Sequence, residues 1–147
     1  MIRQFMGVGS LVLVALCVTI NARAESSITP SQAIEKAAAV APQGITGTFD
    51  VVVRATGDQG GDVFLNSQND YRDPRNVSVV ISPFVGAALM KRFGQSPQSY
   101  FVGKHILVTG EAKRVTIWFY SNGVRTNKYY YQTHIILADA GQLQIVQ

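Results

Sequence analysis

The chain has 147 residues, with 13 Lys and Arg against nine Asp and Glu, which gives a formal net charge of +4 at pH 7. This length suits one domain rather than two, and the composition excludes collagen, coiled-coil and disordered chains. Without residues 1–24 the chain keeps 11 basic and nine acidic groups, a net charge of +2. Such a charge is low for a protein that binds polyanions over most of its surface.

Residues 1–24 have the three parts of a secretory signal peptide: an arginine near the start, an apolar run over residues 6–20, and the cleavage motif Ala-Arg-Ala at residues 22–24. The apolar run is shorter than the roughly 20 residues that cross a bilayer. We therefore expect cleavage after Ala24, no integral membrane segment afterwards, and a periplasmic or secreted protein. Cleavage also removes Cys17, the single cysteine, so the mature protein has no disulfide.

Residues 25–44 are expected to form a polar segment and one short helix. Thr29 is a hydroxyl N-cap, and Pro30 stands at the first helical position. Residues 32–40 are rich in alanine, and Pro42 ends the helical pattern. The alanines predict that this helix packs closely on another element.

From residue 45 onward the apolar period changes to two, which is typical of half-buried strands. We expect strands over residues 45–55, 62–67 and 77–82, with a turn at residues 56–61 and a polar loop at residues 66–76. The domain is therefore predicted to begin with three successive strands.

The next predicted element is an amphipathic helix over residues 84–93. Ser82 is its N-cap, Pro83 occupies its first position, and Gly94 ends it. A helix at this point separates the first three strands from those that follow.

Two long strands are predicted in the second half of the chain. One runs from residue 104 to residue 120, and it returns over residues 129–137 after the turn signal Asn122-Gly123. A short final strand is expected over residues 142–146.

Three strands, one helix and two further strands is the element order of an OB-fold. The position of the helix, together with a glycine bend at Gly110, favours this barrel over an unrelated α+β roll. We therefore predict a mainly β domain at residues 45–147. It is a five-stranded OB-fold Greek-key barrel with a helix between strands 3 and 4, an extra N-terminal helix and an extended hairpin between strands 4 and 5.

Four segments of the chain resemble a known group of proteins. They are VFLNS at residues 63–67, DYRDPRNVSVVI at residues 70–81, YFVGKHILVTG at residues 100–110 and QLQIV at residues 142–146. This pattern resembles small exported bacterial domains described as OB-fold, nucleic-acid-binding-like. The resemblance implies the fold but no catalytic residues. The chain departs from the pattern at residues 115–132, where an aromatic and basic hairpin replaces a short turn.

The polar loop at residues 66–76 is the first candidate site. Its centre is Asp70-Tyr71-Arg72-Asp73-Pro74-Arg75-Asn76. The two arginines could bind phosphate while the tyrosine stacks on a ring. A metal site on the two aspartates lacks a third carboxylate or a histidine, so no metal is predicted. The third interpretation is structural, with each arginine paired to a neighbouring aspartate and the asparagine shaping the turn.

The hairpin at residues 113–131 is the second candidate site. Its proposed ligand-binding residues are Lys113, Arg114, Trp118, Tyr120, Arg125, Lys128 and Tyr130. Cations interleaved with aromatics suit single-stranded nucleic acid, and the same set suits sugar rings or a protein partner. Alternation places Thr116, Trp118 and Tyr120 on the face opposite Val115, Ile117 and Phe119. The alternative is that one of these faces packs in the core.

No phosphate loop, dinucleotide fingerprint or activated serine motif is present in the chain. A thermonuclease-like site could be imagined from residues that form no ordered constellation: Asp50, Arg54, Asp62, Asp70 and Arg72. We therefore predict a non-enzymatic binding protein without a cofactor. Its expected ligand is an oligonucleotide or an oligosaccharide-type polymer, most simply an anionic one. The alternative is an interaction module for a protein of the cell envelope, and the oligomeric state stays open.

Overall fold

The computed structural model describes residues 26–147, so the expected signal peptide lies outside the described residues. The described part of the chain contains, in order, α1 (Pro30–Val40), β1 (Ile45–Val52), β2 (Ala55–Gln59), β3 (Asp62–Asn66), β4 (Val77–Ile81), α2 (Pro83–Phe93), α3 (Pro97–Tyr100), β5 (His105–Ser121), β6 (Val124–Leu137), a 3-10 turn (Ala140–Gln142) and β7 (Leu143–Ile145). Within residues 26–147 no helix is both long enough and apolar enough to cross a membrane.

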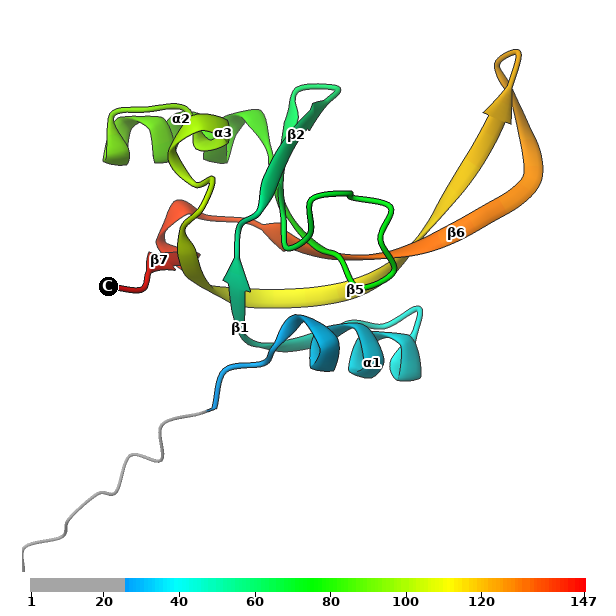
Figure 1. The fold of residues 1–147 in the computed structure, drawn as a ribbon, viewed down its shortest axis with the longest axis horizontal. Coiled ribbons are helices and arrows are strands. Elements are labelled where there is room, and N and C mark those ends of the chain that lie inside the picture. The colour runs from blue at the N-terminus through cyan, green and yellow to red at the C-terminus, as the bar shows by residue number, and fades with distance from the viewer. Residues whose placement is uncertain (1–25) are drawn as a thin grey trace, which may run out of the picture.

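All seven strands belong to one curved sheet (Figure 1). Its hydrogen-bonded path is β1-β5-β6-β4-β3-β2, and β7 adds to β5. The pairs are antiparallel except for β4 and β6, which run parallel. The predicted mainly β class is confirmed. The closed barrel of five strands is not confirmed. Seven strands are present, because the first expected strand is divided and the expected short final strand forms β7, and the path does not close by pairing of its end strands β1 and β2.

The divided strand is the first one. β1 ends at Val52 and β2 begins at Ala55. At the break between them, the Val53 N–H donates to Lys104 O (2.9 Å) and the Arg54 N–H donates to Asn66 O (2.8 Å). The backbone therefore changes its hydrogen-bonding partner between these two residues, from the residue just before β5 to the end of β3. This change allows the chain to alter its direction.

The predicted turn at residues 56–61 was wrong in extent. β2 occupies most of these residues, and Gly57 lies opposite Phe64 in the β2–β3 ladder. The turn is reduced to Gly60 and Gly61, whose φ angles are 64° and 90°. Pairing with β3 therefore overrides the local turn propensity of the glycine-rich sequence.

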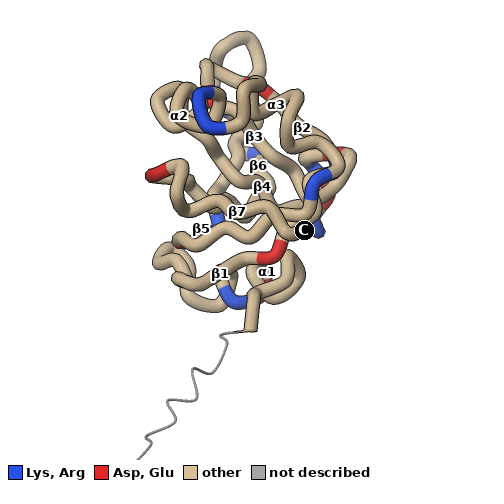
Figure 2. Tube along the Cα trace, turned by 90° about the vertical axis from the view of Figure 1, so that its left-hand side faces the viewer, with Lys and Arg blue, Asp and Glu red and all other residues tan. Residues whose placement is uncertain are grey.

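The helices close the two ends of the sheet, with α2 and α3 at one end and α1 at the other (Figure 2). Thr29 and Gln32 form a capping box on α1, and Ser82 Oγ accepts from Val85 N at the start of α2. Both N-caps were predicted from the sequence. Ala33 of α1 and Leu89 of α2 belong to the same cluster of buried residues as the strands, so both helices pack on one core.

Beyond this core, β5 and β6 continue as a two-stranded arm. β5 pairs with β1 only as far as Ala112, and β6 pairs with β4 only from Thr133 onward. We call residues 113–132 the arm; it projects from the remainder of the fold in Figure 1. Asn122 and Gly123 form its turn with φ angles of 48° and 76°, which confirms the predicted hairpin signal.

Candidate ligand-binding site

The register of the arm sorts its side chains onto two faces. Trp118 lies opposite Tyr129, and Ile117 lies opposite Tyr130. Directly opposed residues share a face, and neighbours along a strand alternate. We call the face of Trp118 and Tyr129 the outer face and that of Ile117 and Tyr130 the inner face. The alternation predicted from the sequence is confirmed, and neither face contributes to the buried core cluster.

The outer face carries a continuous row of aromatic rings with an arginine at each end. The Arg114 guanidinium lies 4.2 Å from the centre of the Tyr131 ring, and the Arg125 guanidinium lies 4.6 Å from that of Trp118. Between them, ring centres are 5.4 Å apart for Tyr131 and Tyr129, and 5.1 Å apart for Tyr129 and Trp118. We call these five residues the outer ladder. Contact with the rings holds both guanidinium groups at the surface beside the aromatic faces.

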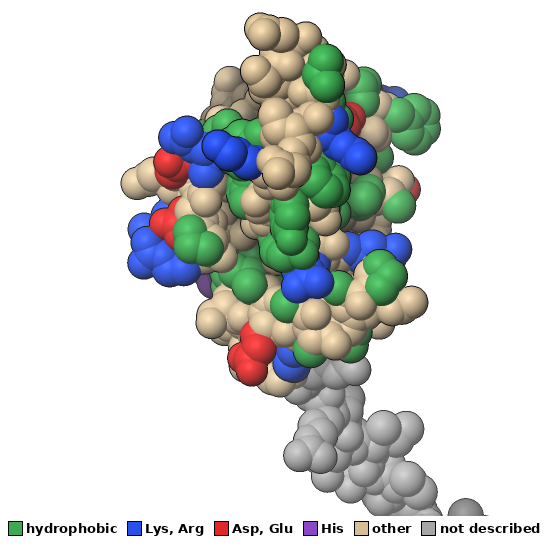
Figure 3. Space-filling view, turned by 90° about the vertical axis from the view of Figure 1, so that its right-hand side faces the viewer, with side chains coloured by type: hydrophobic (Ala, Val, Ile, Leu, Met, Phe, Trp, Pro, Cys, Tyr) green, Lys and Arg blue, Asp and Glu red, His purple; other side chains and the backbone are tan. Residues whose placement is uncertain are grey.

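The arm is cationic, although the net charge of the chain without residues 1–24 is only +2. No Asp or Glu occurs in residues 112–138. Lys113 is paired with Glu111 just before the arm, with 3.2 Å between Nζ and Oε2. The other cations of the arm form no ion pair within the described residues: Arg114, Arg125 and Lys128. Figure 3, which views the molecule from the side on which the arm projects, shows hydrophobic side chains with several Lys and Arg side chains around them.

Near its tip the arm has an irregular register. The pairing shifts between Trp118 and Tyr120, and Tyr120 lies opposite Arg125. Thr126 Oγ1 donates to Phe119 O (2.8 Å), which satisfies a backbone group at the shift. Tyr120 and Lys128 are both exposed, and neither belongs to the outer ladder.

The loop at residues 66–76 holds its own charges in pairs. Arg72 Nε and Nη2 donate to the two carboxylate oxygens of Asp70, both at 3.1 Å. Arg75 forms the same bidentate pair with Asp73 at 3.0 and 2.7 Å. The hydrogen bonds from Arg75 hold the pKa of Asp73 down at about 2. The two arginines considered as phosphate ligands are thus neutralised within the loop.

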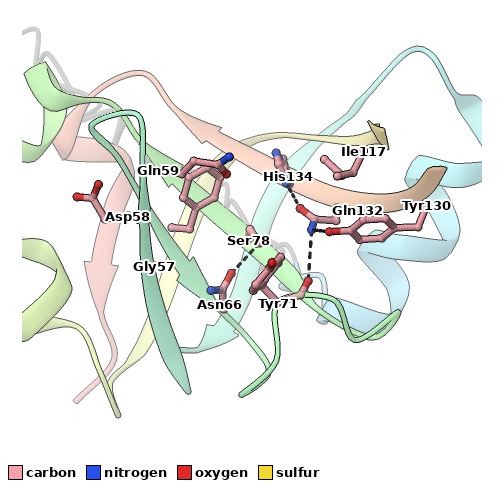
Figure 4. A pocket seen from close by; sticks show the side chains of 11 residues that line it. Gly57, Asp58, Gln59, Asn66, Tyr71, Ser78, Ile117, Tyr130, Gln132 and His134 are labelled. Atoms are coloured by element: carbon pink, nitrogen blue, oxygen red, sulfur yellow. Dashed lines mark hydrogen bonds between the residues drawn. The ribbon is translucent and has the colours of Figure 1, made fainter. Parts of the chain in front are cut away.

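A buried polar network fixes this loop to the sheet. Asn76 Oδ1 accepts from Gln68 N (3.0 Å), and Asn76 Nδ2 donates to Ser78 Oγ (2.9 Å). Ser78 Oγ donates in turn to Asn66 Oδ1 (2.7 Å). Asn76 Nδ2 also reaches Tyr71 O (3.4 Å). The network therefore positions Tyr71, which stands on the side of the loop that faces the arm (Figure 4).

A groove of about 400 Å³ lies between the inner face of the arm, the β2–β3 hairpin and the 66–76 loop (Figure 4). Its lining consists of Gly57, Asp58, Gln59, Phe64, Asn66, Tyr71, Ser78, Ile117, Tyr130, Gln132 and His134. Of the proposed ligand-binding residues, only Tyr71 and Tyr130 lie here. The outer ladder contains Arg114, Trp118 and Arg125, while the remaining five stand outside both surfaces.

Sequence reasoning missed most of the groove. It did not propose Phe64, Gln132 or His134 as ligand-binding residues, nor Tyr129 and Tyr131 of the outer ladder. Strict alternation along β6 would have placed Gln132 and His134 beside Tyr130. No local signal in the sequence brings Phe64 to the same place.

Two of the three acids considered for a hydrolase site, Asp50 and Asp70, form side-chain pairs. Asp50 Oδ1 accepts from His105 Nε2 at 2.6 Å, and Asp70 is bound by Arg72. Within residues 26–147 no group of three or more His, Cys, Asp or Glu side chains is placed to hold a metal ion.

Comparison of the sequence with protein families and with curated proteins identified no relative. No protein-family model matches the chain, and no curated protein matches it. The function is accordingly inferred from the residues of the chain itself.

Proposed function

We propose that the protein is an exported, non-enzymatic binding protein whose arm binds an oligomeric anionic ligand of the single-stranded nucleic acid type. The observation that carries this proposal is the outer ladder. It combines three aromatic rings with two arginines on a segment that contains no Asp or Glu. Export is supported by the composition of residues 1–24, which matches a signal peptide.

The proposal includes an OB-like fold. Its support is the strand path, the parallel pair β4 and β6, and the position of α2 between β4 and β5. If β1 and β2 are counted as one strand bent at Val53 and Arg54, the path has the five-strand order of an OB barrel. The arm then corresponds to an extended connection between its last two strands, an element from which OB-folds commonly bind ligands.

The chemistry of the outer ladder matches that of a flexible polyanion with planar groups. Flat rings on Trp118, Tyr129 and Tyr131 can stack on bases, and each such stack contributes about 1–3 kcal/mol. Arg114 and Arg125 stand at the two ends of the row, where each guanidinium can donate to a phosphate. Binding of this kind needs no sequence-specific contacts and weakens as salt rises.

The test uses the fluorescence of Trp118, the single tryptophan. The purified protein is titrated with oligothymidylate at low salt, and the titration is repeated at high salt. A saturable change that salt abolishes is the expected result, because released counterions drive the binding. The absence of any change at micromolar concentrations would overturn the nucleic-acid proposal.

A second candidate function, a docking module for a protein of the cell envelope, is favoured by the free edges of the arm. Among residues 26–147, residues 113–121 of β5 and 124–132 of β6 pair only with each other. Unpaired strand edges are templates for an added strand. Such a complex would change little with salt, so the same titration series, run with the partner protein, separates the two functions.

A further inference from the structure

The groove on the inner face of the arm has the opposite electrostatic character to the outer ladder. None of its lining residues is Lys or Arg, and Asp58 is its one carboxylate. Its volume of about 400 Å³ falls in the range of small-ligand sites, roughly 300–1,000 Å³. The nearest guanidinium, that of Arg72, lies 5.7 Å from the centre of the Tyr71 ring and is already paired with Asp70.

Three aromatic side chains, one from each wall, supply flat apolar surfaces to the groove. Phe64 comes from β3. Figure 4 shows Tyr71 on the 66–76 loop and Tyr130 on the arm. His134 packs edge-on against Phe64, with ring centres 5.8 Å apart at 64°. Surfaces of this kind accept another ring or the C–H face of a saturated ring.

Amide side chains at the edges of these surfaces supply hydrogen-bonding groups. Gln132 Nε2 donates to Tyr130 Oη (2.9 Å), and Gln132 Oε1 accepts from His134 Nε2 (2.7 Å). This chain of bonds holds the tyrosine and the imidazole in place before any ligand arrives. Gln59 forms no side-chain hydrogen bond within the described residues, so its amide offers a ligand both a donor and an acceptor. Burial lowers the pKa of His134, so this ring is uncharged at neutral pH.

We propose that the groove is a second binding site, which takes one or two rings of an uncharged oligosaccharide. The C–H face of a pyranose packs on aromatic surfaces, while its hydroxyls need donors and acceptors around the rim. An anionic ligand would lie beside Asp58 and find no unpaired cation among the lining residues, and a purely apolar ligand would leave the amide of Gln59 without a partner. The inference does not depend on anion binding, because the two sites lie on opposite faces of the arm.

Nuclear magnetic resonance with the ¹⁵N-labelled protein tests this proposal. The protein is titrated separately with two neutral probes, maltohexaose and the β-1,4-linked hexamer of N-acetylglucosamine. With at least one probe at millimolar concentration, the amide signals of Phe64, Tyr71, Tyr130 and Gln132 are expected to shift, while the indole signal of Trp118 stays unchanged. No shift with either probe, or shifts confined to the outer ladder, would overturn the proposal.

Two exposed tyrosines give a matched pair of variants. Tyr71 is 53% exposed and lines the groove, whereas Tyr120 is 65% exposed and does not. Tyr71→Ala is expected to weaken sugar binding about fivefold through the lost ring contact, and Tyr120→Ala is expected to leave it unchanged. Equal losses in the two variants would place the sugar outside the groove.

Two further measurements separate this proposal from anion binding. Arg125→Gln should leave sugar binding unchanged even though it weakens oligonucleotide binding, so either proposal can fail alone. Titration with oligothymidylate should not shift the amide signals of Phe64 and Gln132, which lie in the groove. If the oligonucleotide shifts those signals as the sugar does, the assignment of the groove to uncharged ligands is wrong.

Discussion

The protein contains two rows of aromatic rings with a cationic side chain at each end. The two rows differ in whether they pack on the buried core. In the first, at the junction of α2 and α3, the Arg92 guanidinium lies 4.7 Å from the centre of the Phe93 ring. Phe93 stacks on Tyr100 at 4.6 Å, and Lys104 Nζ lies 4.5 Å from the Tyr100 ring. Phe101 is fully buried and packs edge-on against both rings. We call this set the α2–α3 row.

The outer ladder has the same side-chain chemistry but lacks such an anchor. Arg92 of the α2–α3 row also donates to Ala140 O and Leu143 O, both at 3.1 Å, so its hydrogen-bonding capacity is used within the fold. Arg114 and Arg125 of the outer ladder have no ion pair among residues 26–147. Aromatic and cationic residues alone therefore do not mark a binding surface. A row that packs on a buried core residue stabilises the fold, whereas a row without such packing remains available to a ligand.

The largest expected effect separates the two rows by stability. Phe101→Ala removes a fully buried ring and should lower the free energy of unfolding by about 3–5 kcal/mol. Trp118→Ala loses only a cross-strand aromatic contact at the surface, so its cost should stay at or below about 1 kcal/mol. Urea unfolding followed by circular dichroism measures both. A loss in Trp118→Ala as large as that in Phe101→Ala would show that the outer ladder is structural.

The next effect concerns the turn that holds the arm together. Gly123 has a φ of 76°, and a β-branched residue there costs about 1–2 kcal/mol. Gly123→Val should speed hydrogen exchange of the arm amides and weaken oligonucleotide binding while the β4 amides stay protected. Gly57→Ala is the control, because an added Cβ there meets no atom within 4 Å. Unchanged exchange in Gly123→Val would mean that the arm is stabilised independently of its turn.

A smaller effect distinguishes free from paired arginines. Arg125→Gln should weaken oligothymidylate binding about fivefold and lower the slope of log affinity against log salt by about 0.7. Arg75→Gln makes the same change of net charge, but Arg75 is already bound to Asp73, so its affinity should change little. The comparison fails if both variants lose affinity equally, since net charge alone would then explain the binding.

The smallest effect is a pH dependence at the base of the arm. Burial lowers the pKa of His134 below the usual histidine value of 6.5, so the unfolded chain binds more protons than the folded chain just below that pH. The uncharged His134 ring therefore makes its full contribution to the free energy of unfolding above pH 6.5. This contribution declines as the pH falls toward the pKa of the folded state. In His134→Gln, the midpoint of unfolding should depend less on pH between pH 7 and about pH 5 than it does in the unsubstituted protein. An equally steep profile in the variant would assign the dependence to another group.

Much of the fold could be predicted because its signals are local. The N-caps Thr29 and Ser82, the turn at Asn122-Gly123 and the period-two strands depend on residues that are adjacent along the chain. The turn predicted at residues 56–61 failed because ladder pairing with β3, and not the glycines, decides where β2 ends. The site was predicted less well because its residues come from separate elements, which only the pairing of distant segments brings together.

The sequence by itself determined the mainly β class, the cationic and aromatic composition of the hairpin, and the two alternating faces of its strands. Only the tertiary structure decided that one face forms the outer ladder while the other joins Phe64 and Tyr71 in a groove. It also decided that Arg72 and Arg75 are neutralised by Asp70 and Asp73, whereas Arg125 rests on Trp118. The physical reason is that periodicity and capping act over a few residues, whereas burial and charge pairing depend on which distant segments the sheet brings into contact.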